Sequence, residues 1–146
     1  MERTRRGSVT HTIARGLRFG GAGFILLNGG VHLYLWGHAY RQIHVIGPLF
    51  LVNAIAALVI AVALILKPEG ITTLLALLFS AGTFMAFVLS VTIGLFGFTA
   101  GWGQNAVIAV GAEIGAIVLL GSWWVMTRRK RGAPPMGERD EGGESG

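Results

Sequence analysis

Four long, nearly uncharged stretches are the feature that most restricts how this chain can fold. The charged residues gather near the two ends of the sequence, in residues 2–18 and 128–144. Between them stand Arg41, Lys67, Glu69 and Glu113. A bilayer core about 30 Å thick requires about 20 helical residues, since each residue adds about 1.5 Å. Four apolar stretches reach that length, at residues 17–36, 46–66, 74–95 and 106–126.

The composition agrees with a membrane protein. Hydrophobic residues make up 53% of the chain and charged residues 13%, and the mean hydropathy is +0.64, which leaves too little polar surface for a water-soluble globule. A single chain segment satisfies its backbone polar groups inside lipid by forming a helix. We therefore predict an all-α, integral membrane four-helix transmembrane bundle over residues 17–126. A basic cytoplasmic segment (1–16) precedes it, and a basic and then disordered cytoplasmic tail (127–146) follows.

The distribution of Lys and Arg predicts the orientation, because positively charged flanks are retained in the cytoplasm. Ten of these residues flank the inner side of the predicted spans: Arg3, Arg5, Arg6, Arg15, Arg18, Lys67, Arg128, Arg129, Lys130 and Arg131. Arg41 alone falls in an outer loop. Both termini are thus predicted to be cytoplasmic, in the plasma membrane. A cleaved signal peptide is the alternative for the first stretch, although Asn28 and His32 are unusual in such a segment.

Several functional classes find no support in the sequence. The chain has no cysteine, which removes disulfides, thiolate catalysis and zinc-thiolate sites. Motifs of serine hydrolases, P-loop enzymes and zinc metalloproteases are absent. The net charge of +5 lies beside hydrophobic spans, where it would meet anionic headgroups, so nucleic acid is not a predicted partner. We predict a protein that is not an enzyme and has no cofactor.

Glu113 is the most informative single residue, because it lies well inside the fourth apolar stretch. An ionisable side chain near the centre of a membrane helix costs about 2.5–3.5 kcal/mol on insertion scales. Its carboxyl is therefore expected to face the bundle interior and to be neutral or paired.

Each of the other three spans places a polar residue at a depth similar to that of Glu113, about 12 Å from the outer boundary. These residues are Asn28, Asn53 and Ser90, and His32 lies one helical turn outward from Asn28. The sequence predicts an intramembrane polar cluster of Asn28, His32, Asn53, Ser90 and Glu113. Such a cluster serves either as interhelical hydrogen-bond glue or as a site for a ligand, protons or an ion.

His38, Arg41 and His44 are candidate functional residues of the first outer loop. His32 and His44, on either side of this loop, are the pair that bis-histidine haem ligation would use. A metal site made of the histidines and Glu113 is another alternative. Otherwise His38 and His44 are interfacial loop residues.

Two segments resemble known membrane proteins: NGGVHL at residues 28–33 and YRQIHVIGPLF at residues 40–50. They look like the first two spans of small uncharacterised multi-pass proteins of actinobacteria. They are more distantly similar to DoxX-like four-helix membrane proteins. The resemblance implies a topology and carries no catalytic motif.

Two classes of function follow from these observations. The first is a non-enzymatic accessory or scaffold subunit of the plasma membrane. It would meet the lipid bilayer and a membrane protein partner, or a second copy of itself in a homo-oligomer, through lipid-exposed helix faces or the basic termini. The second is a small-molecule, proton or metal-ion handling membrane protein that uses the cluster around Glu113 and His32. A membrane haem or quinone redox protein is a third alternative.

Overall fold

The computed structural model describes residues 2–131, with side chains from residue 12 to residue 128. Its elements are α1 (Glu2–Leu35), a π-helical turn η1 (Trp36–Tyr40), α2 (Ile46–Leu66), α3 (Gly70–Thr92) and α4 (Gln104–Arg131). The chain is therefore all-helical over the described residues, as the apolar pattern predicts.

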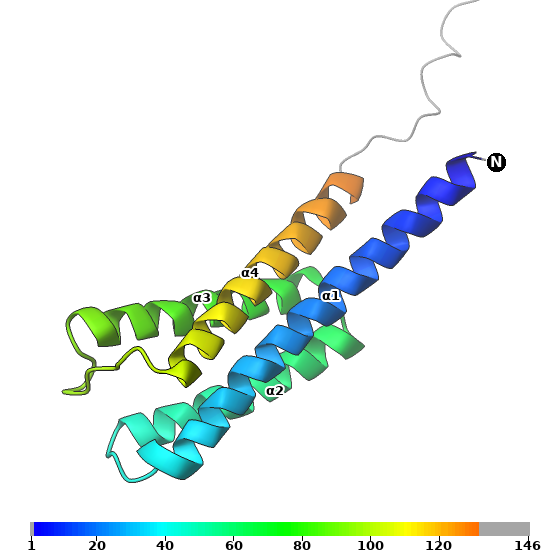
Figure 1. Ribbon diagram of the computed structural model, residues 1–146. Coiled ribbons are helices and arrows are strands. Elements are labelled where there is room, and N and C mark those ends of the chain that lie inside the picture. The colour runs from blue at the N-terminus through cyan, green and yellow to red at the C-terminus, as the bar shows by residue number, and fades with distance from the viewer. Residues whose placement is uncertain (1, 132–146) are drawn as a thin grey trace, which may run out of the picture.

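The four helices form a ring in which each contacts two neighbours (Figure 1). α1 packs extensively against α2 and α4, whereas α3 makes fewer contacts with these same two helices. The N-terminal end of α1, the α2–α3 turn and the C-terminal end of α4 lie toward one end of the bundle (Figure 1). η1 and the α3–α4 loop lie at the opposite end, called the loop end below.

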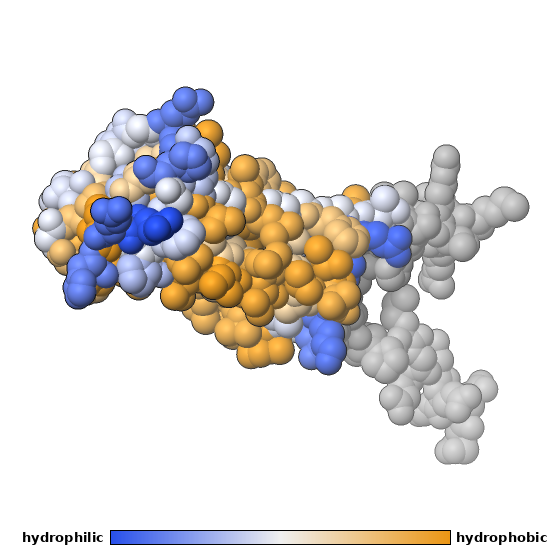
Figure 2. Space-filling view, turned by 90° about the horizontal axis from the view of Figure 1, so that it is seen from below, coloured by the Kyte–Doolittle hydropathy of each residue, from blue (hydrophilic) through white to orange (hydrophobic). Residues whose placement is uncertain are grey.

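The exposed surface of the helices identifies this protein as a membrane protein. Three helices within the described residues are long and apolar enough to cross a bilayer: Ile46–Leu66, Gly70–Thr92 and Gln104–Arg128. Large apolar side chains on them face outward, such as Val52 (61% exposed), Val59 (61%) and Leu78 (60%). Figure 2 shows a hydrophobic band around the middle of the molecule, with hydrophilic residues at both ends. A helix that is apolar on all sides and outwardly exposed requires an apolar solvent.

α1 is less apolar than the other helices, because its middle carries a glycine cluster, Asn28 and His32. The inner faces of this helix are covered by α2 and α4. Because of these polar and small residues, the composition of α1 alone does not place it among the membrane-crossing helices. The prediction of four spans is thus supported for three helices, α2, α3 and α4.

The helix boundaries differ from the predicted spans mainly at the ends of the chain. α2 matches residues 46–66, while α3 starts and ends a few residues before the predicted 74–95. α1 continues outward through the basic segment 1–16 as far as Glu2, and α4 extends five residues past 126 to Arg131. Hydropathy marks only the apolar part of a helix, so it does not reveal where the helix ends when polar residues continue it. The N-terminal end of α1 and the C-terminal end of α4 are of this kind. The predicted disordered tail from residue 132 lies outside the described residues.

Small residues let α1 approach its neighbours closely. A Cβ atom added to Gly29 would lie 2.6 Å from the Cβ of Ala57 on α2. On the other side of α1, a Cβ added to Gly21 would lie 2.5 Å from Leu120 of α4. The core accordingly consists largely of alanine and a few larger aliphatic residues: Ala22, Ile25, Ala57, Ala61, Leu64, Ala76, Ala116 and Leu120. α1 therefore meets α2 through small side chains and backbone, whereas on the α4 side the Leu120 side chain packs over Gly21.

Candidate functional site

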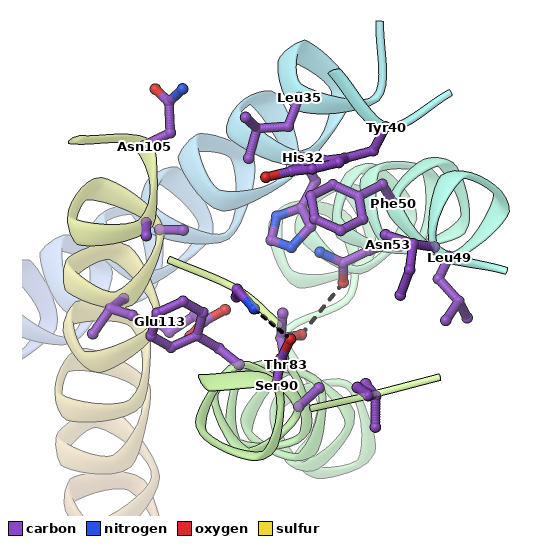
Figure 3. A pocket seen from close by; sticks show the side chains of 18 of the residues that line it. His32, Leu35, Tyr40, Leu49, Phe50, Asn53, Thr83, Ser90, Asn105 and Glu113 are labelled. Carbon is purple, nitrogen blue, oxygen red and sulfur yellow. Dashed lines mark hydrogen bonds between the residues drawn. The ribbon is translucent and has the colours of Figure 1, made fainter. Parts of the chain in front are cut away.

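A cavity of about 640 Å³ opens among the helices in the half of the bundle nearest the loop end (Figure 3). α2, α3 and α4 form most of its wall, with His32 and Leu35 contributed by α1. Most lining side chains are aliphatic or aromatic, and a few polar groups lie among them. This size and this mixture are typical of sites that bind small organic molecules.

Glu113 is the acidic residue of the cavity wall and projects from α4. Its side chain is 2% exposed, and its Oε2 atom is buried without a hydrogen-bond partner. Buried polar atoms in proteins are nearly always bonded, and no protein group occupies this carboxyl oxygen, so it is available to a group that enters the cavity. The expectation that Glu113 faces the bundle interior is thus met by its position.

Asn53 and Thr83 connect α2 to α3 across the cavity wall (Figure 3). The Thr83 hydroxyl lies 3.3 Å from Asn53 Oδ1 and 2.8 Å from the Phe79 carbonyl oxygen of its own helix, so its single proton is shared between these two acceptors. Asn53 Nδ2 is buried and has no acceptor. The amide group therefore offers the cavity a free donor. The sequence reading did not include Thr83, because threonine in an apolar helix commonly bonds its own backbone and gives no distinctive signal.

His32 brings an imidazole ring to the cavity from α1. Its Nδ1 lies 2.9 Å from the Asn28 carbonyl oxygen. A carbonyl oxygen only accepts hydrogen bonds, so Nδ1 carries the proton and donates it. In the neutral ring the lone pair then resides on Nε2. The ring also packs against Phe50, with centroids 4.9 Å apart, which fixes its orientation.

Ser90 holds the α3–α4 loop over the loop end of the cavity. Its hydroxyl donates to the Phe98 carbonyl at 3.3 Å and accepts from the Ala100 N–H at 3.2 Å. Two backbone hydrogen bonds between Leu95 and Phe98 close a tight turn there, with Gly97 at φ 77°. The Phe98 ring then meets the Tyr40 ring edge-on at 5.2 Å between centroids.

The end of α3 lies closer to Ser90 than the sequence predicted. α3 ends at Thr92, so Ser90 lies about 3 Å from the end of its helix, whereas Glu113 lies about 14 Å into α4. The prediction placed the end of this helix at residue 95, and this offset moved Ser90 too deep. Thr83 is the α3 residue about 14 Å from the helix end, and it is the one that bonds Asn53.

The structure brings four of the five predicted cluster residues to one cavity: His32, Asn53, Ser90 and Glu113. Asn28 does not line it, although its side chain is 2% exposed and its Oδ1 has no partner. The outer-loop candidates His38, Arg41 and His44 are exposed and lie outside the cavity. The His38 ring stacks on Tyr34 at 4.2 Å and its Nδ1 donates to the Tyr34 carbonyl.

Metal and haem ligation receive little geometric support. Among the described residues, no group of three or more His, Asp or Glu side chains is arranged to hold a metal ion. His32 lines the cavity and His44 does not, so the two rings do not face a common cavity. Sequence spacing could not show this, because the turn η1 and residues 41–45 decide where each ring points.

Neither protein-family models, nor curated proteins, nor solved structures match this chain. The resemblance of residues 28–33 and 40–50 to small actinobacterial and DoxX-like membrane proteins therefore stays a prediction.

Proposed function

We propose that this chain is a multi-pass membrane protein that binds a small, largely apolar molecule in the cavity beside Glu113. The observation that carries the proposal is the unpartnered Oε2 atom of Glu113, buried in a wall of apolar side chains. Interhelical glue requires a partner for the carboxyl on a neighbouring helix, and Oε2 has none. A ligand would supply that partner.

All four helices cross the bilayer in this proposal, with both termini in the cytoplasm. Supporting this, α1 lies along α2 and α4, and basic residues mark the end opposite the loop end: Arg15, Arg18, Lys67 and Arg128.

The chain is free of cysteine, so a single introduced cysteine reports one position. Gly101→Cys should react with a membrane-impermeant maleimide on intact cells, and Glu69→Cys should react only after lysis. The opposite pattern would refute this orientation.

Binding is tested by filling the cavity. Ala86 lines it and Ala81, on the same helix, is exposed and lies outside it. Purified protein would be photolabelled with a neutral long-chain diazirine, and the labelled peptides mapped by mass spectrometry. Saturable labelling of cavity residues should be lost in Ala86→Phe and kept in Ala81→Phe. Labelling that is equal in both variants and is not reduced by excess unlabelled compound would refute the proposal.

The accessory or scaffold hypothesis is a separate candidate and stays a prediction. Outward apolar faces on α2 and α3 suit lipid chains as well as a partner helix. The cavity is the feature that favours small-molecule binding over it, since a scaffold requires no enclosed volume with unpartnered polar atoms.

A further inference from the structure

We propose that the molecule bound in this cavity is a lipophilic organic cation whose positive charge pairs with Glu113. This inference rests on the proposed binding function and specifies its chemistry. Three features of the cavity support it: the carboxyl of Glu113 in the wall, the aromatic rings that also line the wall, and the apolar rim through which a ligand would enter.

Glu113 is the one lining side chain that can carry a negative charge, and no Lys or Arg lines the cavity. An anionic ligand would therefore be buried without a counterion, which is strongly unfavourable in an apolar surrounding. A cation would find a carboxyl oxygen that no protein group occupies. The wall can therefore balance a positive ligand charge through Glu113, whereas no Lys or Arg is present to balance a negative one.

Aromatic rings surround the part of the cavity nearest the loop end. Phe50 lies at the centre of a small group: its ring is 4.7 Å from Tyr40 and 4.9 Å from His32, and Tyr40 meets Phe98 edge-on. The negative faces of such rings attract organic cations within about 6 Å. Rings and carboxyl together suit a cation with an apolar body better than a small hydrated ion.

The remaining polar atoms of the wall complement an amine. His32 Nε2 carries a lone pair, because Nδ1 donates to the Asn28 carbonyl, so this nitrogen can accept from a ligand N–H group. Asn53 Nδ2 is a free donor for a ligand oxygen. The Asn53 donor would meet an oxygen of the ligand and not its cationic group.

The rim between α2 and α3 is apolar. Leu49 and Val52 on α2 and Leu78 on α3 line the cavity and are also exposed, at 43%, 61% and 60%. α2 and α3 make the fewest contacts of any neighbouring helix pair. In a bilayer this rim faces acyl chains, so a lipophilic molecule dissolved in the membrane reaches the cavity without crossing water.

Binding of a permanent cation should release one proton. In the proposed cycle the carboxyl of the empty cavity is in its neutral O–H form, since an isolated carboxylate is disfavoured among apolar side chains. When the cation enters, the O–H bond breaks, the electron pair stays on the carboxylate, and the proton passes to water. The bound state then holds one positive and one negative charge in contact.

The test compares two probes of nearly identical shape and opposite charge, tetraphenylphosphonium and tetraphenylborate. Binding to the full chain in nanodiscs is measured by equilibrium dialysis, with empty nanodiscs subtracted. Calorimetry in two buffers of different ionisation enthalpy counts the protons released. Glu113→Gln is the test variant, Glu113→Asp keeps the charge, and Glu69→Gln makes the same chemical change outside the cavity.

We expect saturable binding of the phosphonium, release of about one proton, and no saturable binding of the borate. Glu113→Gln should weaken phosphonium binding about tenfold to a hundredfold, the range for a lost charged contact, while Glu113→Asp and Glu69→Gln retain it. If Glu113→Gln binds the phosphonium as tightly as the unchanged protein, or if the borate binds equally well, the cation inference is wrong. Diazirine labelling of the cavity would then still support the proposed binding function. Loss of both signals would refute both proposals.

Discussion

Replacing Gly29 with alanine tests the close approach of α1 to α2. The new Cβ would lie 2.6 Å from the Cβ of Ala57 and 3.5 Å from the Ala54 carbonyl oxygen. Neither atom can rotate away, because a Cβ and a carbonyl are fixed by the backbone. The helices must separate, and overpacking of this kind costs about 1–3 kcal/mol. Alanine recovers about 0.5–1 kcal/mol of helix propensity, so we expect a net loss of up to about 2.5 kcal/mol.

Gly30 provides the matched control on the same helix. It is exposed, and a Cβ added there meets nothing within 4 Å. Gly30→Ala should therefore keep or increase stability, by up to about 1 kcal/mol. The free energy of unfolding would be measured for both variants by denaturation in mixed micelles, with tryptophan fluorescence as the signal. Equal stability of Gly29→Ala and Gly30→Ala would refute the close α1–α2 contact.

A double-mutant cycle then assigns the cost to one pair of atoms. Ala57→Gly removes the Cβ that Gly29→Ala would meet. The double variant should therefore lose less free energy of unfolding than the sum of the losses in the two single variants. Additive losses would place the effect of Gly29→Ala elsewhere, for example in the backbone of α1 itself.

Three further predictions concern the cavity and its loop. Ser90→Ala removes the two side-chain hydrogen bonds to the α3–α4 loop, leaves the backbone bond from the Ala100 N–H to the Ser90 carbonyl, and should cost about 1–3 kcal/mol. The amides of that loop should exchange hydrogen faster, and unchanged exchange would contradict the role of the Ser90 hydroxyl. Thr83→Val deletes the bond to Asn53 and should lower the free energy of unfolding by about 0.6 kcal/mol, measured by chemical denaturation. A decrease above about 2 kcal/mol would contradict a single interhelical hydrogen bond of ordinary strength. Gly97→Ala forces a side chain into a left-handed turn and should cost about 1–2 kcal/mol of thermal stability. Gly101→Ala, at a position without positive φ, should cost less. Equal effects of the two variants would exclude backbone strain at Gly97.

The sequence alone determined the fold class and most of the helix positions. Apolar length fixes how many residues fit across a bilayer, so residues 46–66 are predicted with the bounds that α2 has. The cost of a lone carboxyl in lipid likewise predicts that Glu113 faces inward, because this argument depends on its chemistry and depth and not on any neighbour.

Tertiary structure decided which polar residues meet. Depth arithmetic gives position along a helix axis but not rotation about it, so it grouped Asn28 with residues that line the cavity and missed Thr83. The cavity itself depends on how far α3 stands from its neighbours and on how Ser90 holds the loop above it. These are distances between segments far apart in the sequence, set by packing among all four helices, and no local pattern of residues encodes them.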